Sequence, residues 1–191
     1  QLMPDGAWQD IKRAMTDSMA KHKLSRSVTI LRNNYAKADV ICVQKVSTIT
    51  KKALESALAT EFKIIFPDNT SAEDPTAATT SAIFLRRETF GFGFKEIKDV
   101  TNDVLEIVNE GSHKKVADGE LLAITTVDAS GRPFLVASFH SDGNGTQTKP
   151  VVSAVSKVLE KQGAECRLVF GLDASTVLKP GRKGELGVDA F

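Results

Sequence analysis

Residues 39–47 read DVICVQKVS, and this stretch decides the fold class. Its apolar residues, Val40 to Val43, run without alternation, which is typical of a strand buried on both faces. The strand then meets the polar Gln44 and the basic Lys45. Polar groups at the ends of buried strands often form the sites of open sheets, so we place Lys45 at a candidate site rim.

The composition predicts an ordinary globular protein. The 191 residues are 41% hydrophobic and 26% charged, and 25 Lys and Arg nearly balance 24 Asp and Glu. A formal net charge of +1 provides no global field that would gather nucleic acid, so we predict no specific nucleic-acid partner. We assign residues 1–178 to one α/β domain and residues 179–191 to a basic, glycine-rich tail or loop.

The sequence gives only partial information about where in the cell the protein is located. No apolar run approaches the roughly 18 to 20 residues that a membrane helix needs, so the chain is not expected to span a membrane. The first residues, QLMPDGAW, lack a signal-peptide pattern and an initiating Met. We therefore expect an intracellular protein. It would be located in an organelle if an N-terminal targeting segment has been removed. Cys42 and Cys166 lie in or beside apolar runs, so we expect reduced core thiols, with a disulfide as the alternative.

Two helices are predicted before the central strand. Apolar residues first repeat at three- and four-residue spacing at Trp8, Ile11, Met15 and Met19. A second helical face follows at Leu24, Val28, Leu31 and Tyr35. We expect both helices to cover the strand.

The rest of the chain mixes helices and strands. A helix is predicted over 50–61 and another within 94–110, with strands over 62–66 and 81–87. The sequence LLAITTV-DASGR-PFLVASFH predicts an antiparallel hairpin, because Asp128 and Gly131 supply the turn chemistry. Thr148 is expected to cap a helix that ends before Gly163 and leads to the strand RLVFGLD. This combination favours an α/β sandwich over a doubly wound parallel sheet.

Three strand ends carry candidate functional residues. They are Gln44 with Lys45, His140 after PFLVASF, and Asp173 with Ser175 after RLVFGL. In this order, KADVICVQK, SAIFLRRETF, LVASFH and VFGLDAST resemble the motifs of the endonuclease/exonuclease/phosphatase superfamily, which has the DNase-I-like fold. The resemblance implies a four-layer α/β sandwich and a divalent metal site, normally Mg²⁺, for phosphodiester or phosphomonoester cleavage.

The chain departs from the family pattern at the residues that carry the chemistry. Lys45 stands where the family has its metal-binding Glu, and an ammonium group has no lone pair with which to hold Mg²⁺. Ser175 stands where the family has the Asn of Asp-x-Asn, which contacts the scissile phosphate. The family's first strand and its C-terminal Ser-Asp-His segment find no match, so we expect a sandwich that is incomplete at both ends.

These departures leave His140, Asp173, Ser175 and Lys45 as vestigial site residues, with no active catalytic residue, metal or cofactor expected. Three roles are considered for Lys45: it forms an ion pair with Asp173, it is exposed to solvent, or it binds a phosphate or acidic group. For His140, the alternative to a functional role is a structural one, in which Asp142 or a backbone carbonyl satisfies the imidazole.

We therefore expect a non-catalytic DNase-I-like pseudoenzyme that acts as a structural or interaction subunit, with protein partners in a larger assembly. One alternative is a Mg²⁺-dependent phosphoesterase or nuclease with a rearranged metal site. The other is a non-catalytic binder of a phosphorylated ligand. The Trp8 and Met15 face, together with the two phenylalanines of GFGF (91–94), could also form a docking patch, with burial in the core as the alternative.

Overall fold

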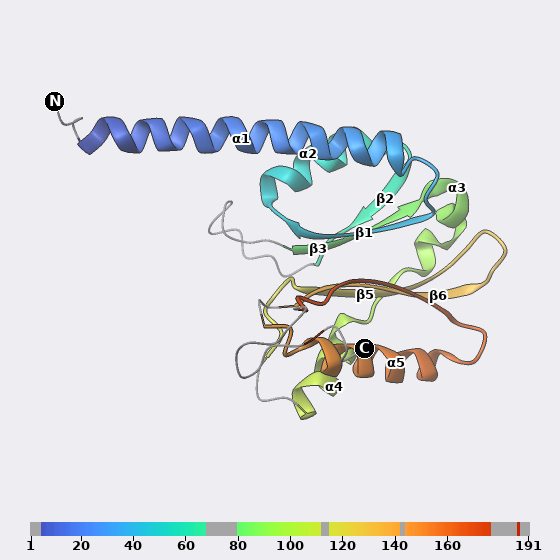
Figure 1. Ribbon diagram of the computed structural model, residues 1–191. Helices are drawn as coiled ribbons and strands as arrows, with labels where there is room; N and C mark the ends of the chain where they lie inside the picture. The colour runs from blue at the N-terminus through green and yellow to red at the C-terminus, as the bar shows by residue number, and fades with distance from the viewer. Residues whose placement is uncertain (1–4, 68–79, 112–114, 142–143, 177–186, 188–191) are drawn as a thin grey trace.

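Two β-sheets form the centre of the protein in a computed structural model that describes residues 5–67, 80–111, 115–141, 144–176 and 187 (Figure 1). The first sheet has the order β1-β3-β2, with β1 at Val40–Val46, β2 at Phe62–Ile65 and β3 at Thr80–Arg86. The second has the order β4-β5-β6-β7, with β4 at Lys98–Asp99, β5 at Leu121–Val127, β6 at Pro133–His140 and β7 at Arg167–Asp173. All strand pairs are antiparallel except β6 with β7, which is parallel.

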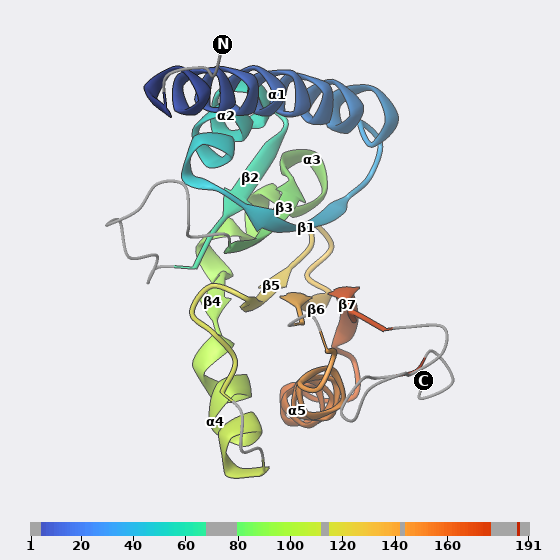
Figure 2. The ribbon, with the colours of Figure 1, turned by 60° about the vertical axis from the view of Figure 1, so that its left-hand side comes forward.

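Helices cover the outer face of each sheet. The long α1 (Asp5–Asn34) and α2 (Thr48–Leu58) lie over the three-stranded sheet, and α4 (Thr101–Gly111) and α5 (Thr148–Gln162) lie over the four-stranded sheet (Figures 1 and 2). The short α3 (Arg87–Phe90) and the 3-10 helix η1 (Gly91–Glu96) connect the two halves. The layer order is helix, sheet, sheet, helix, so the predicted four-layer α/β sandwich is confirmed.

The continuous apolar runs of the sequence are explained by strands that are buried on both faces. In β3, Ile83 and Leu85 enter the core between the sheets, whereas Ala82 and Phe84 enter the core under α1 and α2. Successive side chains of a strand point to opposite faces, so both sets must be apolar. The same holds for β1, where Ile41 belongs to the helix-side core.

The N-terminal region differs from the prediction, because α1 is one continuous helix and not two. The two sequence patterns lie on different faces of this single helix, and no proline interrupts it between Asp5 and Asn34. The side chain of Met19 lies outside the described part of the helix. The two phenylalanines of the GFGF stretch differ in their burial. Phe92 is 83% exposed, whereas Phe94 packs against the core between the sheets.

The predicted hairpin of β5 and β6 is confirmed, and Asp128 organises its turn. One carboxylate oxygen accepts hydrogen bonds from Ser130 N (2.8 Å), Ser130 Oγ (2.7 Å) and Arg132 N (3.0 Å). The other accepts one from Arg132 Nε at 2.7 Å, and Gly131 has the left-handed φ of 80°. The hydrogen bonds from Ser130 and then Arg132 hold the pKa of Asp128 well below its usual range.

The helix α5 begins and ends almost as predicted. Gly163 follows its last residue with φ of 98°, as expected for a C-terminal glycine. Thr148 is its first helical residue and not its cap. The N-cap position is Gln147, whose side chain makes no capping hydrogen bond.

Both cysteines are free, as expected. Cys166 is buried and Cys42 is half-buried, and burial raises the pKa of both thiols. Within the described residues, no helix has the length and hydropathy to cross a membrane. The expected tail at 179–191 lies outside the described part of the chain except for Gly187.

Candidate functional site

The ends of β6 and β7 bring two of the candidate residues together. The helix α5 returns the chain so that β7 runs parallel to β6, and the register pairs His140 with Asp173. The imidazole Nδ1 of His140 lies 3.1 Å from Oδ2 of Asp173. The His140 side chain is 15% exposed and that of Asp173 is 48% exposed. We expected Asp142 or a carbonyl to satisfy His140. The partner is Asp173, and Asp142 lies outside the described residues.

Asp173 and Ser175 are bound into the turn that follows β7. The second carboxylate oxygen of Asp173 accepts a hydrogen bond from Ser175 N at 3.2 Å, and Ser175 has a left-handed φ of 48°. The Ser175 hydroxyl donates to the carbonyl of Ser141 at 3.0 Å. Ser141 N in turn donates to the carbonyl of Asp173 at 2.9 Å. The polar groups of the two strand ends are therefore largely satisfied by each other.

Gln44 joins the other sheet to this rim, which the sequence did not predict. Its Nε2 donates to Ser138 Oγ at 3.2 Å and to the carbonyl of Gly171 at 3.3 Å. Ser138 and Gly171 are paired residues that lie two positions before His140 and Asp173. The end of β1 is therefore held over the ends of β6 and β7. The three predicted strand ends form one rim.

The close approach of β1 to β7 requires a glycine. A Cβ on Gly171 would lie 2.1 Å from Cys42 Cβ and 2.8 Å from Cys42 Sγ. Neither distance is sterically allowed, so a glycine at this position permits the packing of the sheets that carries Gln44 to the rim.

Lys45 lies at an irregularity of β1 and is exposed to solvent. The register of β1 with β3 shifts between Val43 and Val46, and Lys45 has a left-handed φ of 58°. Among the described contacts Lys45 makes no ion pair with Asp173, whose carboxylate lies beside the imidazole of His140. The side chain of Lys45 is exposed to solvent, and a role in binding a phosphate group stays a prediction. The bulge turns the side chain out of the strand, where an ammonium group remains hydrated.

The described residues of the rim do not fit a hard divalent cation. Mg²⁺ needs oxygen ligands, usually with one or two carboxylates. Asp173 is the carboxylate that the rim offers, and its two oxygens accept hydrogen bonds from or pair with Ser175 and His140. Lys45 adds positive charge and no lone pair. Across the described part of the chain, no three His, Cys, Asp or Glu side chains gather in a metal-binding group.

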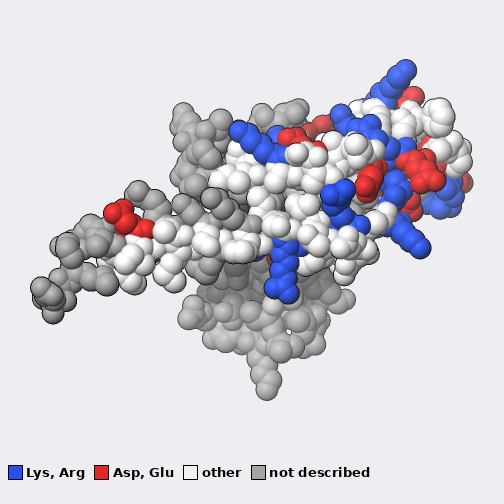
Figure 3. Space-filling model, turned by 90° about the horizontal axis from the view of Figure 1, so that it is seen from above, with Lys and Arg blue, Asp and Glu red and all other residues white. Residues whose placement is uncertain are grey.

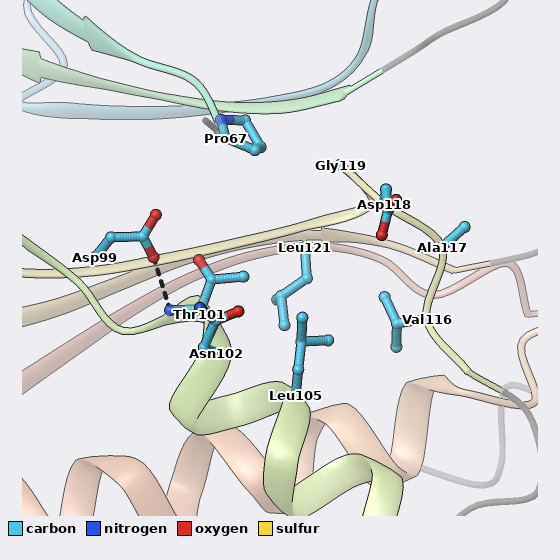
Figure 4. A pocket seen from close by; sticks show the side chains of 10 residues that line it. All are labelled: Pro67, Asp99, Thr101, Asn102, Leu105, Val116, Ala117, Asp118, Gly119 and Leu121. Atoms are coloured by element: carbon cyan, nitrogen blue, oxygen red, sulfur yellow. Dashed lines mark hydrogen bonds between the residues drawn. The ribbon is translucent and has the colours of Figure 1, made fainter. Parts of the chain in front are cut away.

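A pocket of about 310 Å³ lies elsewhere, at the β4 and β5 edge of the second sheet (Figure 4). Asp99 and Asp118 stand at its sides and Leu105, Val116 and Leu121 form its apolar part. Asp99 is already engaged, because its Oδ1 accepts a hydrogen bond from Thr101 N at 2.8 Å at the start of α4. None of the five strand-end residues predicted from the sequence (Gln44, Lys45, His140, Asp173 and Ser175) lines this pocket.

Comparisons with known proteins find similar solved structures but no similar sequences. No protein-family model matches the chain, and no curated protein matches it. A humanized TDP2 of D. rerio matches with a TM-score of 0.55 and 11% identity, over 86% of this chain and 60% of that one. The catalytic domain of human Nocturnin, with bound sulfate, matches with a TM-score of 0.55 and 16% identity, over 82% and 58%. The endonuclease/exonuclease/phosphatase from Bacteroides vulgatus matches with a TM-score of 0.51 and 13% identity, over 74% and 52%.

At these identities the likeness establishes the fold. The chain has the DNase-I-like fold of the endonuclease/exonuclease/phosphatase superfamily, as the sequence motifs predicted. It spans between about half and three fifths of the length of these solved chains.

Proposed function

We propose that this chain is a non-catalytic pseudoenzyme of DNase-I-like fold that serves as a structural or interaction subunit of a larger assembly. The observation that carries the proposal is Lys45, which is basic and solvent-exposed at the position where the family motif has its metal-binding Glu. A fixed positive charge repels a divalent cation and offers it no lone pair.

The state of Ser175 supports the same conclusion. In the family motif the matching Asn contacts the scissile phosphate, but here the hydroxyl of Ser175 donates to the carbonyl of Ser141. A donor that is already bound to the backbone contributes little to stabilising charge in a transition state. The hydrogen bonds of Asp173 likewise give it a structural role within the turn.

The separation of core and rim makes such a loss of activity compatible with the fold. The buried cores lie between the layers, whereas Lys45 and Asp173 are exposed residues at the strand ends. Substitutions at these exposed positions are therefore compatible with the packing of the cores, and the same fold can carry different functions.

A turnover assay tests the proposal. The purified protein is titrated with Mg²⁺ and with Mn²⁺ in the presence of bis-p-nitrophenyl phosphate and of p-nitrophenyl phosphate, beside the Asp173→Ala variant prepared in the same way. We expect equal background rates for both proteins. Metal-dependent turnover that disappears in Asp173→Ala would overturn the proposal, whereas turnover that is equal in both indicates a contaminant.

A working phosphoesterase is the second candidate, favoured by the fold itself, since the superfamily is named for nucleases and phosphatases. It requires a carboxylate from outside the described residues to replace the missing Glu, such as Asp142, which follows His140 by two positions in the sequence. In that case Asp142→Ala abolishes the turnover in the same assay.

A binder of a phosphorylated ligand is the third candidate, favoured by the exposed side chain of Lys45, which follows Gln44 in the sequence. The Gln44 side chain donates to Ser138 and Gly171 of the rim strands. Inorganic phosphate or AMP would then protect Lys45 from acetylation by an amine reagent without any turnover. Equal modification with and without these ligands excludes this candidate.

A further inference from the structure

The helix α1 carries two apolar stripes with different surroundings. The inner stripe comprises Leu24, Val28 and Leu31, of which Val28 and Leu31 pack against the core under α1 and α2. The outer stripe, in the N-terminal half, comprises Trp8, Ile11 and Met15, which are 58%, 39% and 56% exposed. Large apolar side chains that repeat at three- and four-residue spacing along a helix usually mark a face that packs against another element.

The outer stripe is not an extension of the inner one. At 3.6 residues per turn, Trp8 lies about 160° around the helix axis from Leu24, and Ile11 lies about 200° from Leu31. The outer stripe therefore faces away from the domain. The N-terminal half of α1 also projects beyond α2 and the sheets (Figure 1). No described element of this chain is in a position to cover it.

Among the side chains that the structure describes, the exposed charges nearest the line of Trp8 on α1 are basic. Arg26 is in line with Trp8 along the helix, and Lys12 and Lys23 lie about 40° and 60° around the axis from Trp8. Asp10 has the one acidic side chain of α1 that the structure describes, and it lies about 200° around the axis from Trp8. In the view onto α1 from above, basic and acidic residues gather together over the end of the molecule away from the N-terminus, and an acidic group lies near the grey N-terminal atoms (Figure 3).

We propose that the outer stripe binds an amphipathic α-helix of a partner protein, whose apolar residues repeat at three- and four-residue spacing and whose flanks carry Asp or Glu. The proposal rests on the proposed function, since it names the surface through which an interaction subunit would act. Trp8 is the anchor, because aromatic residues dominate the energy of protein interfaces. Lys23 and Arg26 pair with the acidic flank of the partner.

Two other occupants fit the surface less well. In a pair of identical copies, two faces that carry Lys23 and Arg26 would meet without an acidic side chain among those described on either face. An anionic lipid surface would attract the same cations, but Arg26 lies on the same side of α1 as the apolar stripe. A helix that lies in a membrane interface needs a broad apolar face with its charges on the opposite side.

Peptide binding to the full chain tests the proposal. The probe is a fluorescein-labelled helical peptide of three heptads, with Leu at the a and d positions and Glu at e and g, and binding is followed by fluorescence anisotropy. A matched peptide with Lys at e and g controls for apolar attraction alone. We expect the acidic peptide to bind at least about tenfold more tightly than the basic peptide.

Variants locate the binding on α1. Trp8→Ala with Met15→Ala removes the anchors, and Lys23→Glu with Arg26→Glu reverses the charge. Each pair should weaken the acidic peptide about tenfold or more, and the charge reversal should improve binding of the basic peptide. Ile49→Ala is the matched control, because Ile49 is 59% exposed and lies on α2 outside the outer stripe. Circular dichroism verifies that each variant keeps its helix content.

Several results would overturn the proposal: no binding of the acidic peptide, equal loss of binding in Ile49→Ala, or sedimentation of the protein with phosphatidylserine vesicles in preference to the peptide. Concentration-dependent dimerisation that Trp8→Ala abolishes would assign the surface to a second copy instead. These measurements contain no metal and no phosphodiester, so their failure is distinguishable from a failure of the proposed function, which only the turnover assay reports.

Discussion

Nδ1 of His140 and Oδ2 of Asp173 lie 3.1 Å apart, although 33 residues separate them in the sequence. They occupy paired positions at the ends of the parallel strands β6 and β7. The pair closes the polar rim, and Asp173 also accepts a hydrogen bond from Ser175 N. The arrangement is that of a structural contact at a sheet end.

Removal of Asp173 should therefore have a small effect on stability. The Asp173 side chain is 48% exposed, and a hydrogen bond at a partly exposed position contributes little to stability. We therefore expect Asp173→Ala to lower the free energy of unfolding by about 1 kcal/mol or less in urea denaturation. The loss of a buried network would instead cost roughly 3 kcal/mol or more, which would contradict a peripheral role for the pair.

Gly171→Ala should be clearly destabilising, because the added Cβ would overlap Cys42. Overpacking of a closely packed contact typically costs about 1 to 3 kcal/mol, measurable as a shift of the urea midpoint. The matched control is Gly91→Ala, since a Cβ at Gly91 meets no atom within 4 Å and its φ is −55°. Equal stability of the two variants would mean that β1 does not pack on β7 as described.

Asp128 should make stability depend on acidic pH. Its pKa is lower in the folded state than in the unfolded chain, where an Asp titrates near about 3.9. The stability that its charged form contributes is therefore present above that value and is lost as the pH falls toward the lower folded-state pKa. We expect the difference in Tm between the wild type and Asp128→Asn to be largest at neutral pH and to shrink below about pH 4.

The control for this titration is Asp10→Asn, at an exposed position on α1. Its Tm should follow the wild type across the pH range. A gap between the wild type and Asp128→Asn that stays constant from neutral to acidic pH would contradict the assignment of the hydrogen-bonded carboxylate.

Both thiols should react slowly in the folded protein. Burial raises the pKa of Cys42 and Cys166, which lowers the fraction of reactive thiolate. We expect little reaction with Ellman's reagent at pH 8 under native conditions, and two thiols per chain in guanidinium without a reductant. Detection of thiols in guanidinium only after reduction would instead reveal a disulfide.

The sequence was sufficient for features that depend on local chemistry. The burial of β1 on both faces, the Asp128 turn and the glycine at position 163 after α5 each follow from residue types within a few positions. The motifs at Lys45, His140 and Asp173 also predicted the DNase-I-like fold, because they record the order of the strand ends.

The remaining features depend on contacts between distant segments. The two apolar patterns of α1 predicted two helices. Each pattern shows which face of a helical segment is apolar, but it does not show whether two successive segments form one continuous helix. The bond from Gln44 to Ser138 and the choice of His140 over Lys45 as the partner of Asp173 follow from the stacking of two sheets. The left-handed φ of Lys45 is set by a bulge for which its sequence gives no signal.

The binding of a divalent cation at the rim tests the central claim most directly. Mn²⁺ is titrated into the wild type and into Asp173→Ala, and free Mn²⁺ is measured by electron paramagnetic resonance. We predict that the signal of free Mn²⁺ is the same with both proteins and shows no stoichiometric site. A stoichiometric site in the wild type that is lost in Asp173→Ala would contradict the account.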